Sequence, residues 1–281
     1  MSISVVMLVY NEEARIEATL RCVTWCDEIV VLDKHSTDRT REIALRYTPK
    51  VIEIPYSDYD PHALRLALDL VSSEWILLLT ASDVLHPLLA GQIRSLVDRA
   101  DFPYDVIHVP FRRYVLGMSP KRSPWYGDNA AAVFRKEVVS VVDESVHAAL
   151  RFDTKRVYKL SGAEPYCLYH LTHRTVDSMM QRHQLYWRSQ ARLLPPTTSM
   201  WRVALDILRA VVGTVFKRKV FLLGWSGLAL GAAYISYFLM QFVYVWEYRF
   251  SKAGETYDAI RNLIAQAWDQ KAGADGDDAE S

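Results

Sequence analysis

Two apolar segments near the start of the chain each run directly into a turn that carries carboxylate and hydroxyl side chains. The first, ISVVMLVY over residues 3–10, leads into Asn11-Glu12-Glu13. The second, EIVVLD over residues 28–33, leads into KHSTD over residues 34–38. Nearly continuous Val, Ile, Leu and Met are typical of parallel strands that helices cover on both faces. Because parallel strands present the groups that follow them at one edge of the sheet, these turns predict a ligand site at that carboxyl edge.

Both turns also have the composition of helix starts. Asn11 and either Ser36 or Thr37 are predicted as N-caps, with Glu12 and Asp38 in first turns, where the helix dipole favours anions. Any one of these residues could serve as a cap alone. The prediction of a site therefore depends on the two turns together.

Short apolar runs alternate with helical patterns as far as about residue 110. This alternation predicts further strands over 51–54, 75–80 and 106–109, and helices over 62–71 and 87–100. Such a βαβα order favours an α/β fold with a doubly wound, mostly parallel sheet. Proline, glycine and aromatic residues between 111 and 160 predict long loops around short strands, a kind of region that often closes over a pocket. A polar helix is predicted over 174–194.

The chemistry changes after Pro195-Pro196. Residues 201–216 are amphipathic, and residues 220–246 contain no charged side chain, a run longer than the roughly 20 apolar residues of a spanning helix. We expect an α/β domain over 1–194, membrane-associated helices over 195–268 and a disordered acidic tail over 269–281. Both a spanning helix and a helix pair lying in the membrane interface fit the segment 220–246.

The chain has 33 basic and 33 acidic residues, so its formal net charge of zero gives no indication of nucleic-acid binding. Its three cysteines are too few and wrongly spaced for a zinc site or a disulfide framework. A cytoplasmic protein is therefore expected.

Three motifs in order, VVMLVYNEEARIEATLRCV, DEIVVLDKHSTDRTREIA and SSEWILLLTASDV, resemble the inverting glycosyltransferases of family 2, which have the GT-A fold. The likeness covers about residues 2–190. It is greatest for the branch that extends lipopolysaccharide cores and related lipid-linked glycans, which the hydrophobic region after 200 also resembles. The resemblance implies a nucleoside-diphosphate-sugar donor, with a UDP-sugar expected, and a lipid-linked or cell-envelope glycan acceptor. It also implies a location at the cytoplasmic face of a bacterial plasma membrane.

The resemblance assigns a donor site to the two turns. Asp33 would accept a hydrogen bond from the uracil-type ring or the ribose. Backbone groups of Val9 and Tyr10, together with Asn11 and Glu12, would line the same slot.

Two further residues receive roles from the resemblance. Asp38 would hold its own loop in place. Arg65 lies where the family often has a basic or amide residue near the diphosphate, although a solvated helix arginine is an equal alternative.

The family's metal motif is altered. An Asp-X-Asp run normally follows the fourth strand and holds Mg²⁺ or Mn²⁺, hard ions that prefer oxygen ligands. Here the run is Thr80-Ala81-Ser82-Asp83, so both expected aspartates are replaced. Ser82 and Asp83 are still expected to line the donor site, and Asp83 with His147 could hold a metal ion. Alternatively, cationic side chains would neutralise the diphosphate, with the candidates Arg65, Lys121 and Arg122.

Asp128 is the candidate catalytic base. The family pattern is a Glu-Asp pair followed by arginine, and here Gly127 precedes Asp128 and Ala132 replaces the arginine. A carboxylate among aromatic side chains would have a raised pKa suited to a base. An ordinary Gly-Asp-Asn turn is the alternative.

Two other classes of protein are alternatives. A relative that binds a nucleotide sugar without transferring it fits the altered motifs. Another doubly wound nucleotide enzyme fits poorly, since no glycine-rich phosphate loop follows the first strand.

Overall fold

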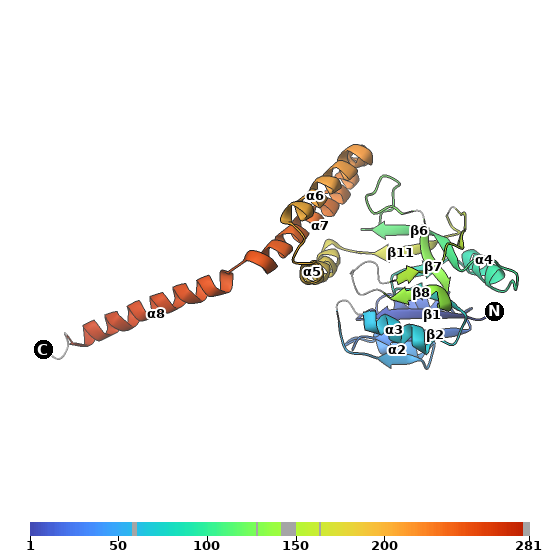
Figure 1. The fold of residues 1–281 in the computed structure, drawn as a ribbon, viewed down its shortest axis with the longest axis horizontal. Coiled ribbons are helices and arrows are strands. Elements are labelled where there is room, and N and C mark those ends of the chain that lie inside the picture. Colours follow the sequence, from blue (N-terminus) through green and yellow to red (C-terminus); the bar gives the residue numbers. More distant parts are fainter. Residues whose placement is uncertain (58–60, 128, 142–149, 163, 278–281) are drawn as a thin grey trace.

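The computed structural model describes residues 1–57, 61–127, 129–141, 150–162 and 164–277. These residues form a mixed α/β domain with a parallel-rich sheet, followed by a helical region that ends in a long helix projecting away from the domain (Figure 1). The predicted α/β fold with a C-terminal apolar helix is confirmed.

The described strands form a nine-stranded sheet in the order β3-β2-β1-β4-β7-β6-β11-β5, with β10 also paired to β6, and a separate β8-β9 pair. Their bounds are β1 Ile3–Val9, β2 Glu28–Asp33, β3 Val51–Glu53, β4 Trp75–Leu79, β5 Asp83–Leu85, β6 Val106–Val115, β7 Asn129–Arg135, β8 Val139–Val141, β9 Leu150–Phe152, β10 Val157–Lys159 and β11 Leu168–Thr172. Strands β3, β2, β1 and β4 are parallel, whereas β7 is antiparallel to both neighbours.

Helices cover both faces of the sheet, as the apolar strands predict. One core contains the inward faces of α1 (Ile16–Cys22), α2 (Thr40–Leu45) and α4 (Pro87–Val97). The second core lies under α3 (Pro61–Leu70) and the β8-β9 pair. This double covering leaves the carboxyl edges of β1, β2 and β4 as the place where polar turns gather.

The predicted N-caps are wrong. Helix α1 begins after Arg15 and α2 after Arg39, and neither of these N-cap residues makes a side-chain capping hydrogen bond. Asn11 instead has a positive φ of 51°, a region that asparagine tolerates better than most residues. The turn residues bond across the sheet edge to each other, as described below, and so are not available to the helices.

Strand β6 is longer than predicted. It continues past Val109 to Val115 because its second half pairs with β11, from Phe111 with Leu168 to Val115 with Thr172. Arg112 and Arg113 therefore lie within a strand, in the region predicted as long loops around short strands.

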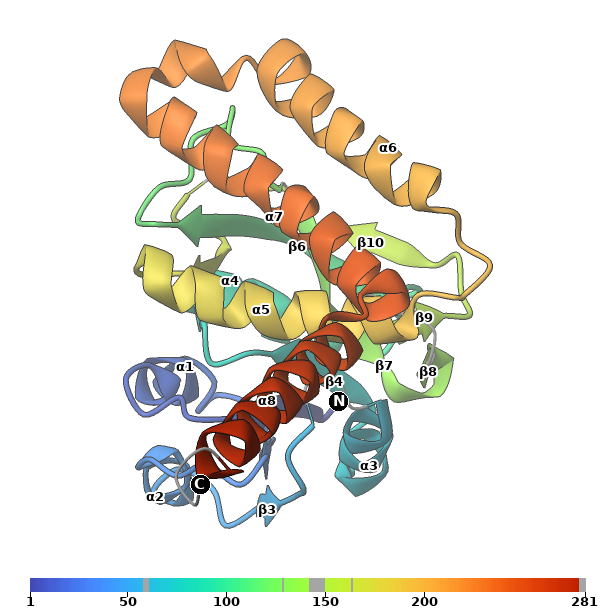
Figure 2. The same cartoon turned by 90° about the vertical axis from the view of Figure 1, so that its left-hand side faces the viewer.

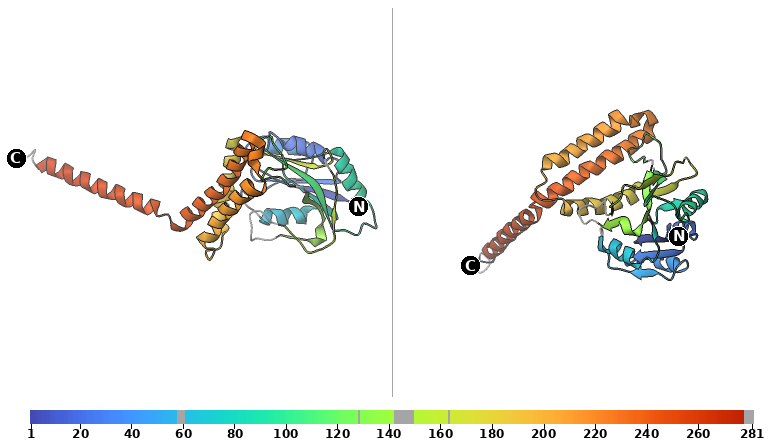
Figure 3. Two further views of the ribbon diagram at one scale, coloured as in Figure 1. Left: turned by 90° about the horizontal axis from the view of Figure 1, so that it is seen from above. Right: turned by 45° about the vertical axis from the view of Figure 1, so that its right-hand side comes forward.

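The helical region consists of α5 Val176–Leu193, α6 Met200–Val211, α7 Gly224–Phe250 and α8 Ala253–Asp277. A short π-helical segment, Val212–Lys217, and a 3₁₀ turn, Val220–Leu223, join α6 to α7. Helices α6 and α7 form a hairpin on the outer side of α5 (Figures 2 and 3). Helix α8 continues into the segment expected to be a disordered tail, and its exposed side chains carry an apolar stripe that includes Tyr257, Ile260 and Ile264.

Among the described residues, one helical stretch, Val220–Phe250, is long and apolar enough to cross a membrane. Its polar neighbour α5 lies along it. Met179 and Leu230 share one apolar cluster, the Trp187 ring lies 5.9 Å from that of Tyr237, and Ala191 packs in a cluster with Val245. The apolar helix α7 thus packs against α5 along much of its length.

Candidate active site

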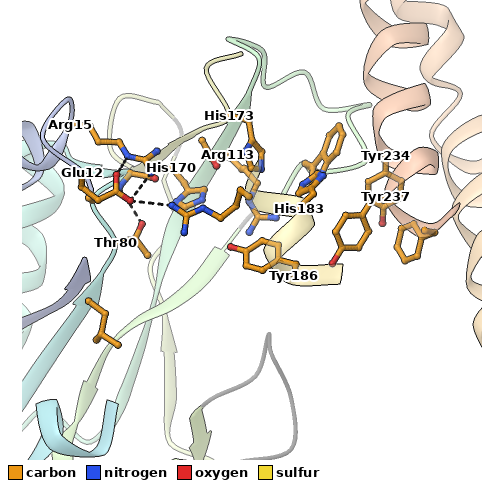
Figure 4. A pocket seen from close by; sticks show the side chains of 17 residues that line it. Glu12, Arg15, Thr80, Arg113, His170, His173, His183, Tyr186, Tyr234 and Tyr237 are labelled. Atoms are coloured by element: carbon orange, nitrogen blue, oxygen red, sulfur yellow. Dashed lines mark hydrogen bonds and ion pairs between the residues drawn. The ribbon is translucent and has the colours of Figure 1, made fainter. Parts of the chain in front are cut away.

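A cavity of about 360 Å³ opens between the carboxyl edge of the sheet and the helices α5 and α7 (Figure 4). Leu8, Glu12 and the turn Thr80–Ser82 line its sheet side. Tyr186 from α5 and Tyr234 and Tyr237 from α7 line the opposite side. Helices α5 and α7 of the helical region therefore form one wall of the cavity, and the sheet edge forms the other.

The first two turns are joined by hydrogen bonds. The Asn11 amide donates to Ser36 Oγ over 2.9 Å, and the Thr37 amide donates to Asn11 Oδ1 over 2.8 Å. The Glu12 amide donates to Thr40 Oγ1 over 2.6 Å. These bonds satisfy backbone groups that the sheet leaves without partners and hold the two turns together at the edge of the sheet.

Asp38 forms part of the same link. It accepts from the Glu13 amide over 3.0 Å and from the Thr40 amide over 2.9 Å. Burial opposes ionisation of Asp38, but the bonds from Thr40 and the Glu13 amide outweigh it and lower the pKa of this carboxyl. The contacts are those of a residue that orders its own loop.

Asp33 ends β2 with only 1% of its surface exposed. Its Oδ1 accepts from the Ser36 amide over 3.1 Å and from the Ser36 hydroxyl. Its buried Oδ2 has no hydrogen-bond partner among the described residues. A buried carboxylate oxygen without a partner is costly, so Oδ2 is a candidate acceptor for a ligand donor.

Val9 and Tyr10 lie beside Asp33. The Val9 carbonyl accepts from the Lys34 amide over 2.9 Å, which ties the end of β1 to the turn after β2. The Tyr10 ring lies 4.4 Å from the Tyr56 ring, centroid to centroid. These residues, with Asn11 and Asp33, lie next to the cavity rather than in its lining, whereas Glu12 lines it.

Both oxygens of Asp83 are occupied. Oδ2 accepts from the Thr80 amide over 2.6 Å and from Thr80 Oγ1 over 2.7 Å. Oδ1 lies 2.7 Å from His170 Nδ1. Asp83 thus closes the turn after β4 and orients the imidazole of His170, while Ser82 lines the cavity.

The described residues at this turn do not by themselves form a site for a divalent metal ion. Mg²⁺ and similar hard ions need several oxygen ligands, usually one or two carboxylates together with substrate phosphates and waters. The described turn offers Asp83 alone, already bonded on both oxygens, and no group of three or more His, Cys, Asp and Glu suited to a metal occurs among the described residues. The predicted partner ligand His147 lies outside the described residues, as does the candidate base Asp128.

Two arginines bind Glu12 inside the cavity. Arg15 Nη2 donates to Glu12 Oε1 over 2.8 Å, and Arg182 Nη2 from α5 lies 3.3 Å from the same oxygen. Glu12, predicted to line the donor slot, therefore also links the first turn to the helical region (Figure 4).

Two histidines line the cavity, His173 just after β11 and His183 on α5. The His173 and His183 rings lie 4.9 Å apart, and His183 also packs against the Tyr237 ring at 4.8 Å. Burial, with the nearby charges of His183 and Arg182, lowers the pKa of His173 to about 3. His173 is therefore neutral in the folded protein at pH 7.

Acidification is expected to destabilise the protein through His173. Its pKa is lower in the folded state than the ordinary 6.5, so the unfolded chain binds the extra proton between pH 6.5 and about 3. Stability is thus lost as the pH falls through this window. His173→Asn, which tolerates the positive φ of 53° at this position, should flatten the dependence of Tm on pH between 6.5 and 4. His62→Asn, on the exposed side of α3, is the control. If Tm depended equally on pH in the unchanged protein and in both variants, the lowered pKa of His173 would not be the cause.

Arg113 on β6 also lines the cavity, although no sequence motif pointed to it. His170 on the neighbouring strand β11, which was also not predicted as a site residue, is paired with Arg113 in register. The sequence signal for Arg113 is the alternation of a strand: if β6 is extended beyond Val109, Phe111, Arg113 and Val115 all point to one face of the sheet.

The three cations predicted to neutralise the diphosphate lie elsewhere. Arg65 on α3 donates to the Val141 carbonyl over 3.1 Å. Arg122 donates to the Arg218 carbonyl over 3.1 Å, and the adjacent Lys121 is exposed. None of the three lines the cavity.

Comparison with known proteins identifies the family. The model of glycosyl transferase family 2 matches residues 4–155, and the chain belongs to this family. Uncharacterized glycosyltransferases of Rickettsia typhi and Rickettsia prowazekii are each 23% identical to it, over 240 and 238 residues, and 80% of each chain is covered in both alignments.

Solved structures give a more distant likeness. S. aureus TarS 1–349 in complex with UDP is 16% identical, with a TM-score of 0.47, and the match covers 89% of this chain and 91% of that one. In another TarS structure the match spans 46% of that chain. Glucosyl-3-phosphoglycerate synthase from Mycobacterium tuberculosis, in complex with Mn²⁺, UDP and glucosyl-3-phosphoglycerate, is 17% identical, with a TM-score of 0.44 and coverage of 70% and 81%.

Proposed function

We propose that this family 2 glycosyltransferase transfers a sugar from a UDP-sugar, with inversion, to a lipid-linked or cell-envelope glycan at the cytoplasmic face of a bacterial membrane. The acceptors of lipopolysaccharide-core extension are of this class. The observation that supports the proposal best is the cavity whose one wall is the carboxyl edge of the sheet and whose other wall is the apolar helix α7. A site built in this way receives a soluble donor and a membrane-bound acceptor from opposite sides.

The donor nucleotide would occupy the linked turns after β1 and β2. Asp33 Oδ2, buried and without a partner among the described residues, is suited to accept a hydrogen bond from the N–H of a uracil ring or from a ribose hydroxyl. The sugar and diphosphate would then extend over the turn Thr80–Ser82 into the cavity.

Transfer with inversion needs one base. The acceptor hydroxyl would lose its proton to the Asp128 carboxylate and attack the anomeric carbon from the side opposite the diphosphate. One carbon–oxygen bond forms, the bond to the phosphate oxygen breaks, and UDP leaves with that electron pair. Asp128 is assigned this role from the sequence motif.

Membrane attachment through α6 and α7 is supported by their exposed side chains. Trp201 is 86% exposed and Trp225 is 87% exposed. Further exposed apolar residues on the hairpin are Leu205, Leu208, Phe216, Phe221, Leu222, Leu239, Val243, Trp246 and Phe250. Such a surface is typical of helices that lie in a membrane interface.

The packing of α5 favours the interfacial arrangement over a spanning one. Helix α5 lies along α7 and carries the exposed arginines Arg188 and Arg192. If α7 crossed the bilayer, these charges would enter the hydrocarbon region at a cost of several kcal/mol, roughly 2.5 or more for each. A helix pair parallel to the membrane surface keeps them in water.

The double variant Trp201→Ser/Trp225→Ser should bind anionic lipid vesicles more than tenfold more weakly than the unchanged chain. Burial of each indole in the interface is worth about 1.5–3 kcal/mol, and both would be lost. Vesicle cosedimentation measures the effect. Leu45→Ser, an exposed apolar residue on α2, is the matched control, and equal binding by all three proteins would contradict an interfacial role for the hairpin.

A second candidate is a relative that binds the nucleotide sugar but does not transfer it. The engagement of both Asp83 oxygens within the protein favours it. The full chain in detergent, supplied with UDP-sugars and membrane glycolipids, distinguishes the two: binding of UDP without hydrolysis or transfer of any sugar would support this candidate over the enzyme.

A further inference from the structure

Arg113 stands in a row of paired positions that begins at the altered metal motif. Asp83 on β5 pairs with His170 on β11, and His170 pairs with Arg113 on β6. Directly paired residues on neighbouring strands point to the same face of a sheet. Figure 4 shows Arg113 beside His170 on the cavity side. A guanidinium thus lies two strands away from the one carboxylate that remains of the metal motif.

The charge of Arg113 has no counterion in the described protein. Arg15 and Arg182, the other arginines of the cavity, both bind the carboxylate of Glu12. Arg113 makes no hydrogen bond or ion pair with any described residue, and its contact is the Phe111 ring, 5.5 Å from the guanidinium carbon to the ring centroid. A partly buried cation with donors aimed into a cavity is suited to bind an anion.

The groups around Arg113 do not replace that anion. Burial lowers the pKa of its guanidinium, while Asp83, Tyr186 and Tyr234 act in the opposite direction. Both Asp83 oxygens are already bonded to Thr80 and His170. Arginine stays charged in proteins, so its five N–H donors remain available to a ligand.

We propose that Arg113 binds the diphosphate of the donor nucleotide and supplies the positive charge that Mg²⁺ or Mn²⁺ would otherwise supply at this place in the fold. The inference rests on the function proposed above. It explains why the turn after β4 keeps a single carboxylate and uses it internally, since no metal ion has to be held there.

The chemical role follows from where charge develops. As the bond between the anomeric carbon and the β-phosphate oxygen breaks, negative charge collects on the departing UDP. Two parallel N–H donors of a guanidinium match a pair of phosphate oxygens and stabilise that charge. The acceptor's proton goes to Asp128, so Arg113 neither gains nor loses one.

The test compares how UDP and uridine bind to the full chain in detergent, measured by calorimetry in EDTA. The unchanged protein should bind UDP more tightly than uridine without any metal. Arg113→Gln should weaken UDP binding at least tenfold, the loss of one charge-assisted contact, and leave uridine binding unchanged. Arg113→Lys should recover part of the UDP affinity, which also shows that the site still folds. Arg112→Gln, on the opposite face of the same strand, is the matched control and should bind UDP as the unchanged protein does.

The outcomes separate the two proposals. If neither UDP nor uridine binds the unchanged protein under any condition, the proposed function itself fails. If UDP binds tightly only when Mn²⁺ or Mg²⁺ is added, or if Arg113→Gln binds UDP as well as the unchanged chain does in EDTA, the role of Arg113 is overturned while the proposed function stands. If Arg113→Gln keeps its UDP affinity but loses affinity for a phosphorylated glycolipid, the phosphate at Arg113 belongs to the acceptor, and its assignment to the donor is wrong.

Discussion

Asp128→Asn is expected to lower the rate of sugar transfer by about 10²- to 10⁴-fold while the affinity for UDP stays within a factor of two or so. The amide has the size of the carboxylate but cannot accept the proton of the acceptor hydroxyl, and a positioned general base contributes about that much to a rate. Single-turnover transfer of radiolabelled sugar to membrane glycolipid measures the rate. Calorimetry with UDP measures the affinity.

The design separates catalysis from folding. Asp153→Asn, at an exposed aspartate after β9, is the control and should transfer sugar at the unchanged rate. Because UDP affinity is predicted to persist in Asp128→Asn, a loss of both binding and rate would point to a structural role for Asp128. An unchanged rate would remove the base assignment altogether.

Asp33→Asn should weaken UDP binding by about 100-fold without destabilising the protein. The buried Oδ2 has no partner among the described residues, so in the ligand-free protein the negative charge is costly and its removal should leave Tm unchanged or raise it. In the complex the same oxygen would accept a hydrogen bond from the nucleotide, and an amide nitrogen in its place would face that donor with another donor.

Opposite effects on stability and affinity are the signature of a ligand-binding residue. Thermal unfolding with and without UDP measures both, because a ligand that binds only the folded state raises its stability. Asp101→Asn, at an exposed aspartate, is the control. A fall in Tm together with unchanged UDP affinity would make Asp33 a structural residue of the Ser36 turn and would remove it from the donor site.

The central strands of the sheet could be predicted because each is a short, continuous run of apolar residues. Residues 28–33 were predicted as a strand and β2 occupies Glu28–Asp33, since a fully buried parallel strand needs a continuous apolar run. The polar turns were also located correctly, but their contacts were not. Asn11 and Ser36 bond to each other's turns, and such a pairing depends on which strands are neighbours rather than on spacing along one segment.

The contacts of the helical wall with the sheet edge could not be predicted for a similar reason. Arg182 reaches Glu12 across 170 positions of sequence, and Tyr234 comes from a helix that composition assigns only to the membrane. Arg113 is identified as a site residue only by the register of β6 with β11, which places it beside His170. The positions of these three residues depend on how distant helices and strands pack together, and a local sequence pattern does not contain that information.

The ion pair between Glu12 and Arg182 has a practical consequence for any study of this protein. Arg182 belongs to α5, which packs against α7. A fragment that lacks α7, made to improve solubility, would therefore disturb α5 and with it the ion pair that holds Glu12 in place. Kinetic constants from such a fragment would describe a different electrostatic environment around the nucleotide. Under the proposed function, in which α7 contacts lipid and Glu12 lines the donor site, any adjustment of α7 upon meeting lipid would be transmitted to Glu12 and would link membrane contact to donor affinity.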